Sequence, residues 1–126
     1  MGITYNVRQV RGVTVIDLGG KIVCGETFAS VSGSGPTLHG FIHDLLSAGH
    51  KNILLNFRDV SYVDSTGIGE LFGCFTTVRS QGGGLAVTNP NERVRNLLNL
   101  TKLNTVLDVT DDETTAVQSF SKAGAA

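Results

Sequence analysis

Residues 52–72 read NILLNFRDVSYVDSTGIGELF. Their opening part, Asn52 to Phe57, is a short and nearly continuous apolar run, which predicts a central strand covered on both faces. A polar loop is expected next. Apolar side chains then recur at the spacing of one helical face, at Ile68, Leu71, Phe72, Phe75 and Val78. The glycines Gly82–Gly84 end this predicted helix. Residues 52–84 are therefore expected to form one strand and the helix that packs beside it.

The N-terminal residues predict an antiparallel hairpin. Apolar and polar side chains alternate from Ile3 to Arg8, which is the period of a half-buried strand. A second strand is expected over residues 13–18, with Arg11–Gly12 as the turn between the two. Gly19–Gly20 is expected to end this second strand.

The other predicted elements alternate between helix and strand. They are a helix over 38–46, a strand over 85–88, a helix opened by Asn89–Asn91, a strand over 106–109, and a helix from Asp111 through Phe120. The order β-β-α-β-α-β-α-β-α implies right-handed crossovers between parallel strands. We therefore predict one α/β domain over residues 1–126: a mixed, mainly parallel five-stranded sheet with an N-terminal hairpin and about four helices. Residues 24–36 are expected to form a flexible loop, and 122–126 a frayed tail.

Composition excludes several classes of protein. Hydrophobic residues make up 40% of the 126 and charged residues 17%, which is enough apolar content for a packed core and excludes disorder over most of the chain. The net charge of −1 argues against direct binding to nucleic acid, which needs clustered Lys and Arg. Apolar runs are far shorter than the roughly 20 residues that cross a bilayer, and the first residues lack a signal-peptide pattern. We expect a cytoplasmic protein without membrane insertion.

Catalytic and cofactor motifs are missing from the sequence. It contains neither a G-x-S-x-G nucleophile elbow nor a Walker A pattern, and Phe72 stands where a dinucleotide motif beginning at Gly67 needs its third glycine. His39 and His43 are four residues apart, but a polar helix face explains them better than a metal site. Cys24 is interpreted as an exposed thiol and Cys74 as a core residue. We expect no enzyme activity, no cofactor and no bound metal.

One polar segment, Asp64–Gly69, has two interpretations. Asp64, Ser65 and Thr66 are all good helix N-caps, although a helix needs only one. The segment can be a redundant cap, followed by glycines that let the helix pack closely on the sheet. Alternatively, its hydroxyl is a modification site, because free N–H groups and the helix dipole favour added negative charge there. Gly67 and Gly69 would then leave the backbone open to a docking protein. Arg58, seven positions before Ser65, is the nearest basic residue along the sequence.

The segment Val63–Gly69, within residues 52–72, resembles the signature of the STAS domain in bacterial anti-sigma factor antagonists. The resemblance continues through residues 82–87 and 97–103 and covers nearly the whole chain. It implies a STAS-like fold and a partner-switching role, in which the unphosphorylated antagonist binds an anti-sigma factor that is also a serine kinase, and so frees a sigma factor.

The same resemblance assigns roles to individual residues. Ser65 would be the residue that the kinase phosphorylates, with Thr66 as the second candidate, and a PP2C-type phosphatase would reverse the reaction. The partner would be bound through Asp64, Ser65, Thr66, Gly67, Ile68 and Gly69. ATP and metal ions would belong to the partner enzymes.

The sequence departs from the family at the predicted end of the second strand. Family members often carry acidic residues there that help contact the kinase, whereas this chain reads Gly20-Lys21-Ile22-Val23. The loop over 24–36 is also longer than usual. The alternative hypothesis is a non-switching STAS module, acting as a scaffold or as a soluble subunit of a membrane transport system. A small enzyme is a distant third.

Overall fold

The computed structural model describes residues 4–22 and 38–124, without the side chains of residues 38, 39, 66 and 121–124. The predicted loop over 24–36, Cys24 and the last two residues therefore lie outside the described part. Within that part the strands are β1 (Thr4–Val10), β2 (Val13–Ile22), β3 (Asn52–Val63), β4 (Gly84–Thr88) and β5 (Asp108–Thr110). The helices are α1 (Leu38–Ser47), α2 (Ser65–Ser80), α3 (Glu92–Leu100) and α4 (Glu113–Gly124), and a short 3-10 helix, η1, covers Leu103–Thr105.

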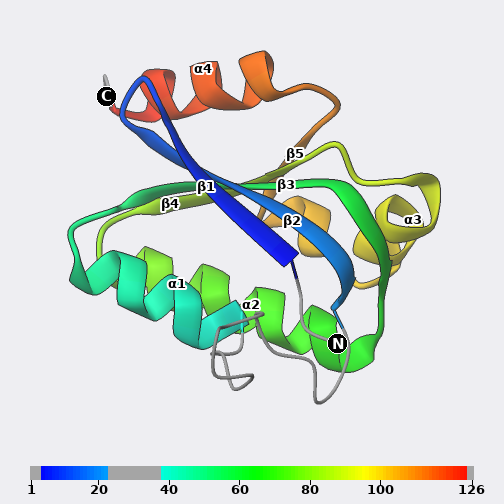
Figure 1. The fold of residues 1–126 in the computed structure, drawn as a ribbon. Helices are drawn as coiled ribbons and strands as arrows, with labels where there is room; N and C mark the ends of the chain where they lie inside the picture. Colours follow the sequence, from blue (N-terminus) through cyan, green and yellow to red (C-terminus); the bar gives the residue numbers. More distant parts are fainter. Residues whose placement is uncertain (1–3, 23–37, 125–126) are drawn as a thin grey trace.

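The five strands form one sheet in sequential order, which confirms the predicted mixed, mainly parallel architecture (Figure 1). β1 and β2 are antiparallel, and the β2–β3, β3–β4 and β4–β5 pairs are parallel. Arg11 and Gly12 both have positive φ angles, 51° and 81°, between the paired residues Val10 and Val13. A two-residue turn with this geometry matches the twist of the strands that it joins.

The sequential strand order determines which face each helix covers. Crossovers of one hand that always step in the same direction place their helices on the same face of the sheet. Accordingly α1, α2 and α3 pack on one face around the larger core cluster, whereas α4 packs on the other (Figure 1). The smaller cluster under α4 consists of Val13, Val15, Leu54, Ala86, Ala116, Val117 and Phe120.

Two strands are longer than predicted. β2 continues through Gly19–Gly20 to Ile22, with irregular register near both glycines. A side chain at Gly19 would collide with the Thr4 hydroxyl, so glycine here permits close strand approach and does not end the strand. The predicted polar loop after Phe57 is also wrong, because this segment pairs with the added part of β2 as far as Val63. Consequently β3 runs almost directly into α2, with one residue between them.

The C-terminal elements shift slightly. Val106 was expected in the fifth strand, but its N–H and that of Leu107 bond to the carbonyl of Leu103, which keeps both in a turn after η1. β5 therefore begins at Asp108. The helix α4 extends to Gly124, so residues 122–124 of the predicted tail have helical backbone.

Candidate functional site

The first turn of α2 is built around Asp64. This residue is the N-cap, in extended conformation, and its side chain accepts a 2.8 Å hydrogen bond from the backbone N–H of Gly67. Its own N–H donates to the carbonyl of Ile22 at the end of β2, at 3.3 Å. The helix therefore begins at Ser65 and is tied to two strands of the sheet.

Ser65 is the first residue of α2, and its side chain is exposed. Because Asp64 already caps the helix, the Ser65 hydroxyl is not needed for this purpose. It lies among backbone N–H groups that have no partner within the helix, where a negative charge is favoured. The side chain of the second candidate, Thr66, lies outside the described side chains.

The two glycines of the segment have different surroundings. Gly67 is buried, and a Cβ there would overlap the carbonyl oxygen of Ile22 and lie 2.8 Å from a methyl group of Val63. A Cβ on Gly69 would meet no atom within 4 Å. Packing thus requires glycine at position 67 but not at 69. Ile68, between them, is partly buried and packs against the larger core cluster.

The exposed face of α2 continues from this turn. Ser65, Gly69, Phe72 and Thr76 are all exposed and follow at helical spacing. Phe72 was predicted on the buried face of this helix, but its side chain is 54% exposed. Leu71, one residue earlier, points into the core instead and is fully buried. A large aromatic side chain is therefore presented on the same face as Ser65.

A cavity of about 210 Å³ lies between the start of α2 and α3. It is lined by Tyr62, Val63, Asp64, Ser65, Arg93, Asn96, Leu97 and Leu100. Leu100 is 80% exposed and Tyr62 is 38% exposed, so apolar surface faces solvent beside the Ser65 hydroxyl. The sequence did not predict that α3 contributes to the site. One signal in the sequence could have indicated this. Leu100 is an apolar residue at the end of α3, and it lies outside the buried face that Val94 and Leu98 form.

Asn91 holds α3 beside the site. Its side-chain oxygen accepts a hydrogen bond from the N–H of Val94 at 2.8 Å and so caps the helix. Its amide nitrogen donates to the carbonyls of Val60 and Ser61 in β3, at 3.1 and 3.4 Å. One side chain thereby fixes the N-terminus of α3 against the strand that leads to Ser65.

The histidines and the described cysteine have other roles. Nδ1 of His50 lies 3.0 Å from the Thr14 hydroxyl and 3.2 Å from the Gln9 amide nitrogen, which links α1's exit to β1 and β2. His43 is exposed. Cys74 is fully buried, and this burial raises the pKa of its thiol to about 12, as expected of the predicted core residue. Among the residues that the structure describes, no three His, Cys, Asp or Glu side chains are arranged to hold a metal ion.

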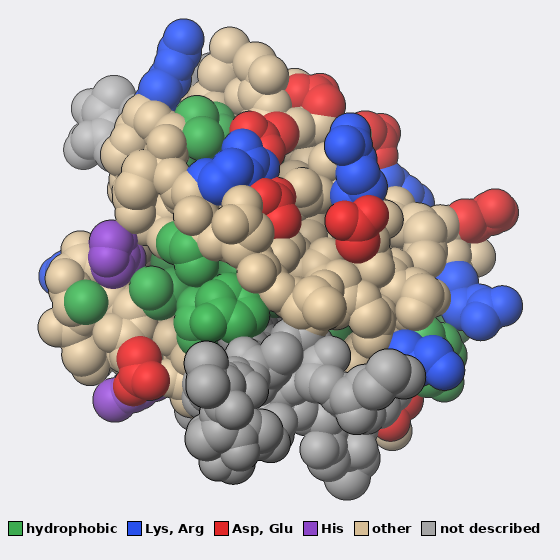
Figure 2. Space-filling model, in the orientation of Figure 1, with side chains coloured by type: hydrophobic (Ala, Val, Ile, Leu, Met, Phe, Trp, Pro, Cys, Tyr) green, Lys and Arg blue, Asp and Glu red, His purple; other side chains and the backbone are tan. Residues whose placement is uncertain are grey.

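A charged network lies on the α4 face of the sheet. Arg8 on β1 bonds to Asp17 on β2 at 2.7 Å and to Glu113 at the start of α4 at 2.5 Å. Asp17 also accepts a 2.7 Å hydrogen bond from the Asn56 side chain. The bonds from Arg8 lower the pKa of Asp17 to about 2. On the face shown in Figure 2, acidic and basic side chains are interspersed rather than gathered into a patch of one sign.

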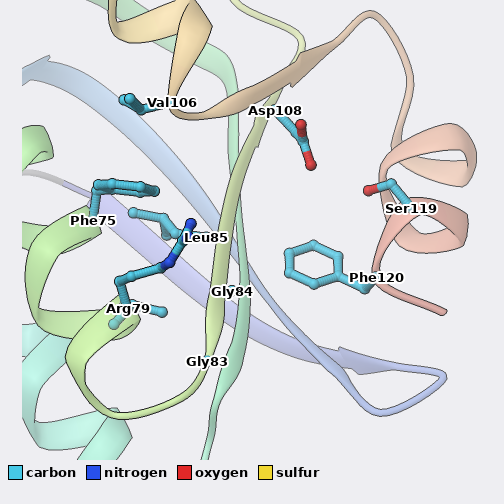
Figure 3. Close-up of a pocket in the computed structure, with 10 residues that line it drawn as sticks. Phe75, Arg79, Gly83, Gly84, Leu85, Val106, Asp108, Ser119 and Phe120 are labelled. Carbon is cyan, nitrogen blue, oxygen red and sulfur yellow. The ribbon is translucent and has the colours of Figure 1, made fainter. Parts of the chain in front are cut away.

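A second cavity, of about 270 Å³, lies where α2 ends and β4 begins (Figure 3). Phe75, Arg79, Leu85, Val106, Asp108 and Phe120 are among the residues that line it. The guanidinium of Arg79 lies 5.8 Å from the centre of the Phe75 ring. This cavity shares no lining residue with the one beside Ser65, so the two are separate features of the molecule.

Comparisons with known proteins agree with this architecture. The profile of the STAS domain matches residues 4–116. The chain belongs to the STAS domain family. It is 30% identical over 118 residues to the anti-sigma-B factor antagonist of Bacillus subtilis, covering 94% of this chain and all of that protein.

Solved structures of anti-sigma factor antagonists share the fold. An anti-sigma factor antagonist from Mycobacterium paratuberculosis superposes with a TM-score of 0.74 at 18% identity, covering 94% of each chain. SpoIIAA, an anti-sigma factor antagonist, matches in its unphosphorylated form with a TM-score of 0.62 at 20% identity, covering 91% of this chain and 94% of that one. The phosphorylated Bacillus form gives 0.63 at 20% identity, over 91% and 97%. No helix in the described part of the chain has the length and apolar content to span a membrane.

Proposed function

We propose that this protein is an anti-sigma factor antagonist controlled by phosphorylation of Ser65. In the cytoplasm the unphosphorylated form binds an anti-sigma factor that is also a serine kinase, and so releases a sigma factor. The kinase phosphorylates Ser65 and the antagonist dissociates; a PP2C-type phosphatase restores it. The observation that carries this proposal is the position of Ser65: an exposed hydroxyl at the first residue of a helix that its neighbour Asp64 already caps.

The position suits a modification that acts on a partner and spares the fold. A phosphate adds a charge of about −1.5 to −2, and a helix N-terminus tolerates that charge. The capping bond from Gly67 to Asp64 does not involve the Ser65 side chain. Support also comes from SpoIIAA, whose two forms fit this chain equally well, with TM-scores of 0.62 and 0.63.

The exposed surface beside Ser65 supplies the docking area in this proposal. Phe72 on α2, and Tyr62 and Leu100 next to the cavity, offer apolar contact. Gly69 lets a partner approach the α2 backbone closely. A phosphate dianion buried in such an interface beside Asp64, without a counter-ion from the partner, would cost about 3 kcal/mol, or roughly a hundredfold in affinity.

Lys21 lies where the resemblance to the family implies acidic residues that help contact the kinase. It is exposed, and it pairs in register with Tyr62 at the edge of the proposed docking area. The kinase partner is therefore expected to present an acidic or neutral surface opposite this position, because like charges across an interface are unfavourable.

Phosphorylation is tested by intact-mass analysis after incubation with ATP and an anti-sigma factor serine kinase from the same organism. We expect one added phosphate on the wild type and none on Ser65→Ala. Ser61→Ala is the matched control, because Ser61 is also exposed but bonds to the Gly20 carbonyl, and it should be phosphorylated normally. Equal phosphorylation of Ser65→Ala would identify another hydroxyl, with Thr66 as the next candidate.

A further inference from the structure

Arg93 shares the cavity beside Ser65, although it is distant in sequence. Both side chains line the same space of about 210 Å³, one from the start of α2 and the other from the first turn of α3. Arg58, the nearest basic residue along the chain, does not line this cavity. The fold thus places Arg93, 28 positions further along the chain, at the same cavity as Ser65.

The guanidinium of Arg93 is available in the unmodified protein. Its side chain is exposed and makes no ion pair with the described residues. Arg95, two positions later, is different because it pairs with Asp111 after β5. The two arginines of α3 can therefore be compared directly: among the described residues Arg95 has an ion-pair partner and Arg93 has none.

We propose that Arg93 is the intramolecular counter-ion of phosphorylated Ser65, holding the phosphate between the N-terminus of α2 and the first turn of α3. The inference rests on the proposed function in taking Ser65 as the modified residue. An arginine fork matches the oxygens of a phosphate and binds two of them at once. The α2 backbone N–H groups face the same phosphate from the other side.

The pairing has a consequence for the switch. Leu97 and Leu100 line the same cavity as Arg93 and Ser65, so an Arg93 side chain that turns toward the phosphate would cover part of this apolar lining. Phosphorylation then both adds charge to the docking surface and withdraws apolar area and a cation from it. The backbone stays in place, because only a long flexible side chain has to move.

The test uses phosphoserine installed at position 65 by amber suppression, so that no kinase is needed. The second pKa of a phosphoserine is about 6, and ³¹P NMR follows its titration. We expect the wild-type value to lie about half a unit lower than in Arg93→Gln, with Arg93→Lys in between. The Nε–H resonance of Arg93, but not that of Arg95, should shift on phosphorylation.

Arg95→Gln is the matched control and should titrate like the wild type. Identical titrations of the wild type and Arg93→Gln would overturn the proposal, as would an equal effect of Arg95→Gln. Thermal midpoints of all variants verify that they are folded. Because no kinase is present, this result is independent of whether the kinase modifies Ser65, which the mass measurement decides separately.

Discussion

Two groups of polar side chains, one on the α4 face of the sheet and one at the start of α2, differ in whether they are paired within the chain. On the α4 face, Arg8, Asp17 and Glu113 satisfy one another through bonds of 2.5 to 2.7 Å. At the start of α2, Asp64 caps the helix, while the side chains of Ser65 and Arg93 are exposed. Charges that are paired within the chain contribute to its stability, whereas polar groups left at the surface are available to a partner. Substitutions in the first cluster should therefore change stability, and those in the second should change binding.

The largest effect is expected at the buried point of the functional turn. In Gly67→Ala the new methyl group overlaps the Ile22 carbonyl, so β2 and α2 must separate. We expect a loss of about 3 kcal/mol in the free energy of unfolding, measured by urea denaturation. A loss below about 1 kcal/mol would mean that the contact between β2 and α2 adjusts easily, and that this turn is not rigidly held.

The charged network should make stability depend on pH. The folded-state pKa of Asp17 is about 2 against an ordinary value of 3.8, so its contribution is present above pH 3.8 and is lost as the pH falls through about 2. Asp17→Asn should cost about 1.5 kcal/mol at neutral pH, after allowance for partial exposure, and should flatten the acid limb of a stability–pH curve. An unchanged acid limb would show that the network contributes little.

The open glycine should respond in the opposite direction to Gly67. Gly69→Ala adds a methyl group that contacts nothing and reduces the freedom of the unfolded chain. Stability should rise by between about 0.5 and 1 kcal/mol in the same urea experiment. Affinity for the kinase partner should fall, because the methyl group lies on the proposed docking face. A decrease in stability would contradict the distinction between the two glycines.

The smallest effect on stability is expected at Ser65 itself. Ser65→Ala leaves the Asp64 cap intact, so the free energy of unfolding should change by less than about 1 kcal/mol. The variant should still bind the kinase and act as a constitutive antagonist. Ser65→Asp, which carries a single charge without phosphate geometry, should lose only part of the binding. Calorimetric titration with the kinase checks both, and loss of binding by Ser65→Ala would point to a direct role of the hydroxyl in docking.

Local patterns predicted most of the fold, and long-range packing accounts for the rest. The hairpin, the sheet composition and the buried positions Leu71 and Val78 follow from periodicity and turn chemistry. The added parts of β2 and β3 pair with each other in an irregular register. The local sequence of either segment does not show this pairing. Phe72 was misplaced because helical spacing does not show where the buried face of α2 ends: Leu71 is fully buried, whereas Phe72, one position further round the helix, is 54% exposed.

The candidate site was predictable only along one segment. Asp64 and Ser65 carry a recognisable capping pattern, so their position at a helix start could be predicted from local chemistry. The contribution of α3 could not, because it depends on the Asn91 side chain reaching the carbonyls of β3. Arg93 and Leu100 come to Ser65 through that tertiary contact.

The most direct test compares Ser65 with phosphorylated Ser65 in the same protein. Affinity for the anti-sigma factor kinase is measured by calorimetric titration, and the thermal midpoint of each form is measured alongside. The account predicts that phosphorylation weakens binding by about a hundredfold or more while the midpoint stays nearly unchanged. Equal affinities, or a large fall in the midpoint with amide NMR shifts far from residues 60–75, would contradict a switch that acts on the partner and leaves the fold intact.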